Sequence, residues 1–205
     1  MKKSLLLALV LLSSQSLFGW GARRCIPVCC EVETPIAGID KIHFDGRIAA
    51  FIPTGDRFRS IYGSPIAAYE FEIGKIFAKH YEIWANVDYV TTSGSTPKFH
   101  SKTSYRSVNL SGGGKYVFRF HPQANLYLGL GINGAFVHVH NDSAFVKRNV
   151  NKDGVGGVAK LGLYFEPTTH FFMEFFVDYL YQTIQFQSRV QVGGVKIGGG
   201  IGACF

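Results

Sequence analysis

The sequence predicts an all-β fold, an eight-stranded antiparallel transmembrane β-barrel with short periplasmic turns and longer outer loops. From residue 39 onward, segments of about 10 to 14 residues alternate between apolar and polar side chains. Short and long connections alternate between these segments. After the N-terminal region, no run of 18 apolar residues exists that could form a transmembrane helix.

The composition favours one exported domain. The chain has 205 residues, of which 47% are hydrophobic and 17% charged, and its 24 glycines exceed the average usage of about 7%. The net charge is +7, and loss of Lys2 and Lys3 with a signal peptide leaves about +5. Export argues against a nucleic-acid partner. The basic balance therefore favours anionic lipid headgroups or polyanions outside the cell.

The N-terminus has the three parts of a secretory signal peptide. Lys2 and Lys3 are its positive region, residues 5–12 are its apolar region, and residues 13–21 are rich in small side chains. An uncleaved anchor is the alternative, but the apolar part is short for a membrane span. The expected domains are a signal peptide over 1–20 with cleavage between 16 and 22, a periplasmic cysteine-containing tail over 21–38, and an outer-membrane barrel over 39–205.

Eight segments are each long enough to be a tilted transmembrane strand of about 9 to 11 residues. They are residues 40–52, 65–77, 81–92, 104–120, 124–138, 155–166, 171–184 and 193–205. Short turns are expected at 78–80, 121–123 and 167–170, and long connections at 53–64, 93–103, 139–154 and 185–192. An even number of strands places both ends of the barrel on the periplasmic side.

Each strand separates into two faces by residue parity. In the first strand the apolar face is Ile42, Phe44, Ile48, Ala50 and Ile52, and the polar face is His43, Asp45 and Arg47. The two faces are least distinct in the seventh strand, because Phe172, Phe176 and Leu180 share the face of Glu174 and Asp178. A closed barrel satisfies every backbone group internally, so lipid is the natural solvent for the apolar face.

Aromatic residues on the apolar face gather near the two ends of the strands. The periplasmic group is Phe44, Phe77, Tyr81, Phe118, Phe120, Phe165, Phe171 and Phe205, and the outer group is Tyr69, Tyr89, Phe136 and Tyr181. Two such belts are typical of proteins that anchor aromatic rings at lipid headgroups. A secreted soluble barrel of the lipocalin type would instead have apolar residues inside, and the belts argue against that arrangement.

The last strand ends on an aromatic residue preceded by alternate apolar positions. These positions are Ile197, Ile201, Ala203 and Phe205. The pattern resembles the C-terminal signal that outer-membrane barrels present to the barrel-assembly machinery. With the strand layout and signal peptide, residues 39–205 resemble the OmpA/OmpX/OmpW-type superfamily of small outer-membrane barrels. Ala203 departs from that signal, which often has a bulkier residue there.

The polar face predicts a lumen filled by ion pairs, because a barrel of eight strands is only wide enough for side chains. The inward ionisable residues are Asp45, Arg47, Glu70, Glu72, Glu82, Asp88, Lys115, Arg119, Lys160, Glu174, Asp178 and Lys196. Buried charges are tolerated when they are paired. The inward glycines 129, 131, 162, 200 and 202 would make room for Trp84, Arg119 and their neighbours.

Two glycine-rich motifs imitate nucleotide-binding loops. Residues 129–134 match GxGxxG, but the flanking residues form one strand and not a strand followed by a helix. Residues 111–115 resemble a phosphate loop, but Tyr116 stands where a magnesium-binding Ser or Thr is needed. We therefore expect no cofactor and no catalytic site.

The cysteines are candidates for a disulfide, because export places them in an oxidising compartment. They are Cys25, Cys29, Cys30 and Cys204. One tail cysteine could bond Cys204 and hold the tail at the barrel mouth; cross-links between molecules and free thiols are the alternatives. The tail lacks a second cluster at zinc-site spacing, so we expect no metal site.

The outer loops are basic and predict contact with polyanions, lipopolysaccharide or host glycans among them. The candidate residues are Arg57, Arg59, Lys98, Lys102, Arg106, Lys147, Arg148 and Lys152.

The resulting hypothesis is a monomeric outer-membrane barrel with a structural or surface-interaction role. A narrow porin-like channel for small or hydrophobic solutes is one alternative. A lipid-A-modifying enzyme is another, suggested only by His138, His140, Asp142 and Ser143 on one loop.

Overall fold

The protein is a single closed β-barrel in the part of the chain that the computed structural model describes. That part is residues 41–77, 80–95, 101–142, 148–168, 170–185 and 189–205. Its elements are β1 (Ile42–Pro53), α2 (Asp56–Tyr62), β2 (Ile66–Phe77), β3 (Tyr81–Ser95), β4 (Lys102–His121), β5 (Ala124–Asn141), β6 (Asn149–Phe165), β7 (Phe171–Gln185), β8 (Arg189–Gln191) and β9 (Gly194–Cys204). The proposed signal peptide and cysteine-containing tail lie outside the described residues.

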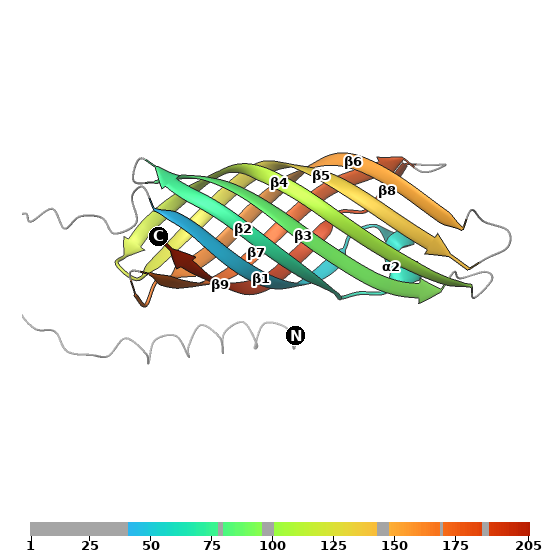
Figure 1. Ribbon diagram of the computed structural model, residues 1–205, viewed down its shortest axis with the longest axis horizontal. Coiled ribbons are helices and arrows are strands. Elements are labelled where there is room, and N and C mark those ends of the chain that lie inside the picture. The colour runs from blue at the N-terminus through green and yellow to red at the C-terminus, as the bar shows by residue number, and fades with distance from the viewer. Residues whose placement is uncertain (1–40, 78–79, 96–100, 143–147, 169, 186–188) are drawn as a thin grey trace, which may run out of the picture. The chain divides into compact units, whose positions relative to one another are not determined.

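Eight tilted strands form the barrel wall (Figure 1). Their order is β6-β5-β4-β3-β2-β1-β9-β7, and pairing of β6 with β7 closes the circle. Every pairing is antiparallel, and Lys160 on β6 lies opposite Asp178 on β7 at the closing seam. Among the described residues, the short β8 pairs with β7 alone. The predicted fold class is confirmed.

The connections alternate in length, as predicted. The β2–β3, β4–β5 and β6–β7 connections are short and lie at one end of the barrel, which we call the turn end. The longer connections lie at the opposite end, which we call the loop end. Both ends of the barrel sheet meet at the turn end, where the Ile42 amide donates to the Phe205 carbonyl over 3.1 Å.

The structure corrects the prediction in three places at the loop end. The segment 139–154 is mostly strand, because β5 runs to Asn141 and β6 starts at Asn149, with Val139 opposite Val150. The connection 53–64 contains helix α2, and 185–192 contains β8. The helix has seven residues, too few for its period to be read from the sequence. No helix among the described residues is long and apolar enough to cross a membrane.

The apolar face points outward, and the ionisable face points inward. Burial alternates along all of β1, with the residues in phase with Arg47 buried and those in phase with Ile48 exposed. Leu130 and Ile132 on β5 are 73% and 74% exposed. Every aromatic residue assigned to the two belts is exposed on this outward face. The exposed surface thus has the polarity that lipid requires and water disfavours.

The interior is layered along the barrel axis, which the sequence analysis did not predict. Apolar side chains fill the part nearest the loop end, among them Phe51, Ile66, Val90 and Ile184. Ionisable side chains occupy the middle. Near the turn end the rings of Tyr127 and Tyr164 lie 4.7 Å apart, and Phe172 packs edge-on against Tyr164.

Inward glycines admit the large interior side chains, as predicted. A Cβ atom at Gly131 would lie 2.7 Å from the Trp84 ring, and one at Gly162 would lie 2.4 Å from the Tyr127 hydroxyl. Real Cβ contacts are not this close, so these two positions must remain glycine while the rings stay in place.

Candidate functional site: the filled lumen and the loop end

Arg47 on β1 is the centre of the buried charge network. Its guanidinium contacts four carboxylates from two other strands, each at a nitrogen–oxygen distance of 3.0 to 3.1 Å. They are Glu70 and Glu72 on β2 and Glu174 and Asp178 on β7. The guanidinium also lies 3.5 Å from the centre of the Phe176 ring, which adds a cation–π contact. One arginine therefore links β1 to β2 on one side and to β7, beyond β9, on the other.

Three lysines extend this network, and each bridges two carboxylates. Lys115 contacts Glu72 and lies 2.9 Å from Glu82, Lys160 contacts Glu72 and lies 3.6 Å from Asp178, and Lys196 contacts Asp88 and lies 2.9 Å from Glu70. Tyr164 accepts a hydrogen bond from Lys115 over 2.6 Å. Lys160 also lies 4.0 Å from the centre of the Trp84 ring. Each ammonium is held from more than one strand.

The structure brings together eleven of the twelve ionisable residues that the sequence placed in the lumen, each at most 5% exposed. The twelfth, Arg119, lies half-buried toward the turn end of β4. The predicted network did not include its neutral partners, such as Asn86, which donates to Glu70 over 3.1 Å, and Asn109, which donates to Asp88 over 2.6 Å. Both asparagines have inward parity, which was the available signal. Side chains thus fill the middle of the barrel.

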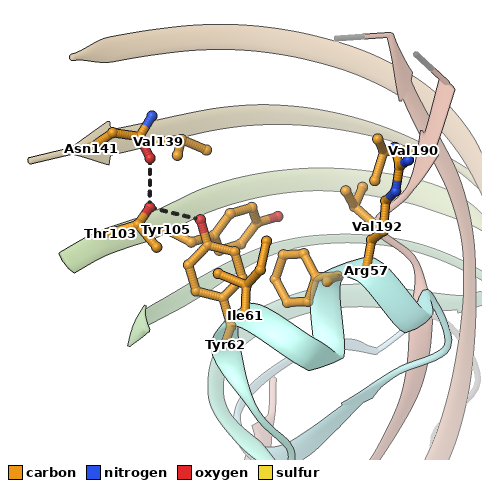
Figure 2. Close-up of a pocket in the computed structure, with 10 residues that line it drawn as sticks. Arg57, Ile61, Tyr62, Thr103, Tyr105, Val139, Asn141, Val190 and Val192 are labelled. Atoms are coloured by element: carbon orange, nitrogen blue, oxygen red, sulfur yellow. Dashed lines mark hydrogen bonds between the residues drawn. The ribbon is translucent and has the colours of Figure 1, made fainter. Parts of the chain in front are cut away.

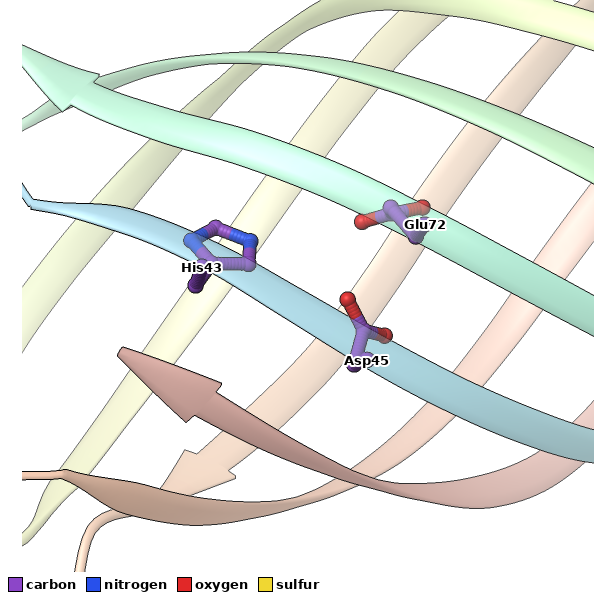
Figure 3. A group of neighbouring side chains, drawn as sticks. All are labelled: His43, Asp45 and Glu72. Atoms are coloured by element: carbon purple, nitrogen blue, oxygen red, sulfur yellow. The ribbon is translucent and has the colours of Figure 1, made fainter. Parts of the chain in front are cut away.

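His43, Asp45 and Glu72 bring donor atoms of metal-binding type within 4.8 Å of one another (Figure 3). The sequence analysis expected no metal site. Glu72 already contacts Arg47 and two lysines, and the Arg47 Nε atom lies 3.8 Å from an Asp45 oxygen. These neighbouring positive charges oppose a divalent cation, so the cluster fits the ion-pair network better than a metal.

A cavity of about 210 Å³ opens at the loop end, between α2 and the barrel wall (Figure 2). Its lining is mainly apolar and includes Ile61 from α2, Val139 from β5, and Val190 and Val192 from the β8 region. Sequence reasoning missed this cavity, because it depends on a helix that the sequence did not predict.

Aromatic packing positions α2 over this cavity. Phe58 is buried and packs edge-on against Tyr105 with ring centres 4.7 Å apart, and its ring centre is 4.8 Å from that of Tyr62. Thr103 donates to Asn141 over 2.9 Å, which leaves the Tyr62 hydroxyl to donate to Thr103 over 3.2 Å. Burial raises the pKa of Tyr62, so this hydroxyl keeps its proton at neutral pH.

The candidate polyanion-contact residues divide into two groups. Arg57, Arg59, Lys102 and Arg148 are exposed around the loop-end mouth, and Arg59 pairs with Asp56 over 2.8 Å. Arg106 and Lys152 lie further down the wall, on β4 and β6. Lys98 and Lys147 are outside the described residues.

The remaining candidate residues are placed as follows. His140 contacts Asp142 over 3.2 Å, and Ser143 lies outside the described residues. The assembly-signal residues Ile197, Ile201 and Phe205 are exposed on the outward face, and Ala203 is half-exposed. Cys204 is half-buried at the turn end. The tail cysteines are outside the described residues, so the disulfide stays a prediction.

Comparison with known proteins identifies the fold but no sequence family. The sequence matches no protein-family model and no curated protein. The fold is that of the small eight-stranded barrels of the outer membrane. At identities of 13–14%, these likenesses are likenesses of fold, and they confirm the predicted architecture.

Three solved structures illustrate the similarity. OprG of Pseudomonas aeruginosa is 14% identical, with 82% of this chain and 97% of OprG covered and a TM-score of 0.62. Neisserial surface protein A is 13% identical, with 80% and 96% covered and a TM-score of 0.55. Ail, the attachment invasion locus protein of Yersinia pestis, solved with the heparin analogue sucrose octasulfate, is 14% identical, with 82% and 99% covered and a TM-score of 0.53.

Proposed function

We propose that this chain is an outer-membrane surface protein that binds polyanions through its loop end. In this proposal the turn end faces the periplasm and the loop end faces the outside of the cell. The observation that carries it is the group of exposed cations around the mouth, Arg57, Arg59, Lys102 and Arg148. The filled lumen supports a role at the surface, because paired side chains occupy the path that a solute would take.

The ligand chemistry follows from these side chains. Guanidinium groups form paired, charge-assisted hydrogen bonds with sulfate, phosphate and carboxylate. Three of the four cations at the mouth are arginines on α2 or beside the β5–β6 loop. The complex of Ail with sucrose octasulfate supports the idea that a barrel of this size can present such a surface. Sulfated glycans and anionic glycolipids are the ligand classes that fit.

Heparin binding by the purified full chain in lipid nanodiscs tests this proposal. We expect the Arg57→Gln/Arg59→Gln/Arg148→Gln variant to bind heparin at least about tenfold more weakly, which corresponds to about 1.4 kcal/mol. Lys75→Gln removes an exposed cation at the turn end and should leave the affinity unchanged. Raising the salt concentration should weaken binding by the unmodified protein. Unchanged heparin affinity in the triple variant would contradict the proposal.

A second candidate function, binding of a small hydrophobic solute, is favoured by the cavity beneath α2. An apolar cavity of about 150 Å³ in a protein core can hold benzene, and this cavity has about 210 Å³. The apolar layer below it ends at the ion-pair network. The cavity would therefore bind a solute and not conduct it directly.

Benzene titration, followed by methyl NMR in nanodiscs, tests this candidate. We expect saturable shifts at the Val139 and Val192 methyl groups, which line the cavity. Ile132, exposed on the outward face, reports simple partitioning into lipid and should shift without saturation. Ile61→Trp should fill the cavity and abolish the saturable shifts. Shifts at Val192 that stay linear in benzene would remove this candidate.

A further inference from the structure

His138, His140 and Asp142 occupy alternate positions at the loop end of β5 and one residue beyond it. Alternate residues of a strand share one face and lie about 6.6 Å apart. The two histidines have the outward parity of exposed Phe136, so they lie on the outer surface of the barrel and not in a loop. The Asp142 amide donates to the Lys102 carbonyl over 3.0 Å, which keeps this residue in line with the strand.

Both histidine rings are held from the neighbouring strand β6. The Nδ1 atom of His138 lies 2.5 Å from Asn151 Oδ1, and that of His140 lies 2.6 Å from Asn149 Oδ1. Each asparagine is directly opposite its histidine in the strand register. An amide oxygen only accepts hydrogen bonds, so each Nδ1 atom carries the proton. In a neutral ring the Nε2 atom then has a lone pair, which is the form of histidine that binds a metal ion.

The Nε2 atom of His140 faces a second acceptor. It lies 3.2 Å from Asp142 Oδ1, and no described lysine or arginine forms an ion pair with that carboxylate. Two acceptors that face each other need a positive charge between them, which a proton or a metal ion can supply. An ion about 2.1 Å from both atoms would join them at roughly 100°, close to the tetrahedral angle of zinc sites. The His140 and Asp142 side chains are 35% and 53% exposed, so an ion can reach them.

We propose that His138, His140 and Asp142 form a surface site for a divalent transition-metal ion, with zinc as its representative. Two imidazoles and one carboxylate, with water in the fourth position, are a ligand set that zinc uses. The His140 and Asp142 donors are already placed to share one ion. The three donor atoms do not all lie within 4.8 Å of one another, so His138 would join by turning its ring toward His140. The inference goes beyond the proposed function, because it uses none of the cations of the mouth.

Two cations of β4 act against a bound metal ion. Arg106 lies opposite His138, and Lys102 is next to Asp142 through the backbone hydrogen bond. Neither of them forms an ion pair with Asp142, so the carboxylate keeps its charge for the ion. A guanidinium beside the site repels a divalent cation, and we therefore expect removal of the Arg106 charge to strengthen metal binding.

The test is a titration of the full chain with zinc chloride in lipid nanodiscs, without a histidine tag and at about pH 8, where imidazole is neutral. Nitrogen NMR reports each histidine ring separately, so zinc bound elsewhere on the chain does not interfere. We expect saturable shifts of the Nε2 signals of His138 and His140 with zinc. Magnesium prefers oxygen ligands and should cause none. Shifts at His140 alone would overturn the role of His138. No shift at either ring would mean a His140–Asp142 ion pair only and would overturn the site.

Substitutions of the carboxylate and of a nearby cation test the ligand set. Asp142→Asn should weaken zinc binding at least about tenfold, which corresponds to about 1.4 kcal/mol. Arg106→Gln should strengthen it. His121→Gln removes an exposed histidine at the turn end and should leave the zinc affinity unchanged. Folding of each variant is checked by heat-dependent gel mobility. The same zinc affinity in Asp142→Asn as in the unmodified chain would overturn the assignment.

Asn149 is a positioning residue, because it holds the His140 ring without touching the ion. Asn149→Leu removes the acceptor at Nδ1 and should weaken zinc binding by about 10- to 100-fold, as is usual for groups that orient metal ligands. Asn149→Asp keeps an acceptor at this position and should restore the affinity. Equal zinc affinity of the leucine and aspartate variants would show that this hydrogen bond does not prepare the site.

Discussion

At the scale of single residues, Arg47 contacts more buried carboxylates than any other described cation. Four carboxylates lie within 3.1 Å of its guanidinium, and it is 1% exposed. Replacing a whole buried ion pair by well-packed apolar side chains often leaves the folding stability unchanged or raises it. Removal of one partner is different, because it leaves opposite charges buried without compensation.

We expect Arg47→Met to destabilise the folded barrel by about 3–5 kcal/mol, the usual cost of breaking a buried pair. Urea unfolding in detergent micelles, followed by Trp84 fluorescence, measures the change. Trp84 reports the folded lumen because it is 1% exposed. Arg59→Met is the control, since Arg59 is exposed on α2 and pairs only with exposed Asp56 among the described residues. Equal stability of the two variants would show that the network around Arg47 is not needed for the fold.

The sequence predicts which residues of the network point inward but not which of them meet. Parity alone places Arg47 and Glu174 inside, because side chains alternate along a strand. Their contact at 3.1 Å depends on the stagger of strands β1 and β7, which share β9 as a neighbour. That stagger is a property of the closed barrel and not of any one strand.

At the scale of elements, α2 is the feature that most changes the interpretation of the loop end. A helix of seven residues is too short to be stable alone. Phe58 holds it against Tyr105, and Asp56 in its first turn complements the helix dipole. The amino-acid pattern does not predict this helix, since only Phe58, Ile61 and Tyr62 follow a helical spacing.

We expect Phe58→Ala to release α2 without unfolding the barrel. Removing a packed phenylalanine ring costs about 3–5 kcal/mol, more than such a short helix supplies itself. Hydrogen exchange at the Arg59 and Gly63 amides, which bond to Gly55 and Arg59, should accelerate at least about tenfold. Ser60→Ala on the exposed side of the helix is the control. Slow exchange in Phe58→Ala would mean that other contacts hold the helix.

At the scale of the whole molecule, the two faces of the barrel follow from the alternation of the sequence, and the interior layers do not. The outward band and its aromatic belts were predictable because they need only parity and strand ends. The apolar layer near the loop end was not, because Phe51 and Ile184 come from distant segments and share the inward parity of charged residues. The basic mouth was predictable from composition, but the place of each cation on the barrel required the strand register.

We expect the purified barrel to show no stable single-channel steps in planar lipid bilayers. The paired side chains around Arg47 fill the middle of the lumen, and moving them apart would expose uncompensated charges. Conductance recorded at neutral pH, with a 16-stranded porin as positive control, makes the measurement. Regular steps from the unmodified chain would favour the porin-like alternative.

The unequal lengths of the strands give the barrel an uneven rim. Strands β4, β5 and β6 have 20, 18 and 17 residues, whereas β1 and β2 have 12 each. In the proposed orientation, the described ends of β4, β5 and β6 therefore extend further from the membrane than those of β1 and β2, and an antibody or a neighbouring cell would meet them before the shorter strands. Helix α2 connects the two short strands, so the cavity beneath it lies where the wall is lower and the longer strand β5 supplies Val139 and Asn141 to its far side.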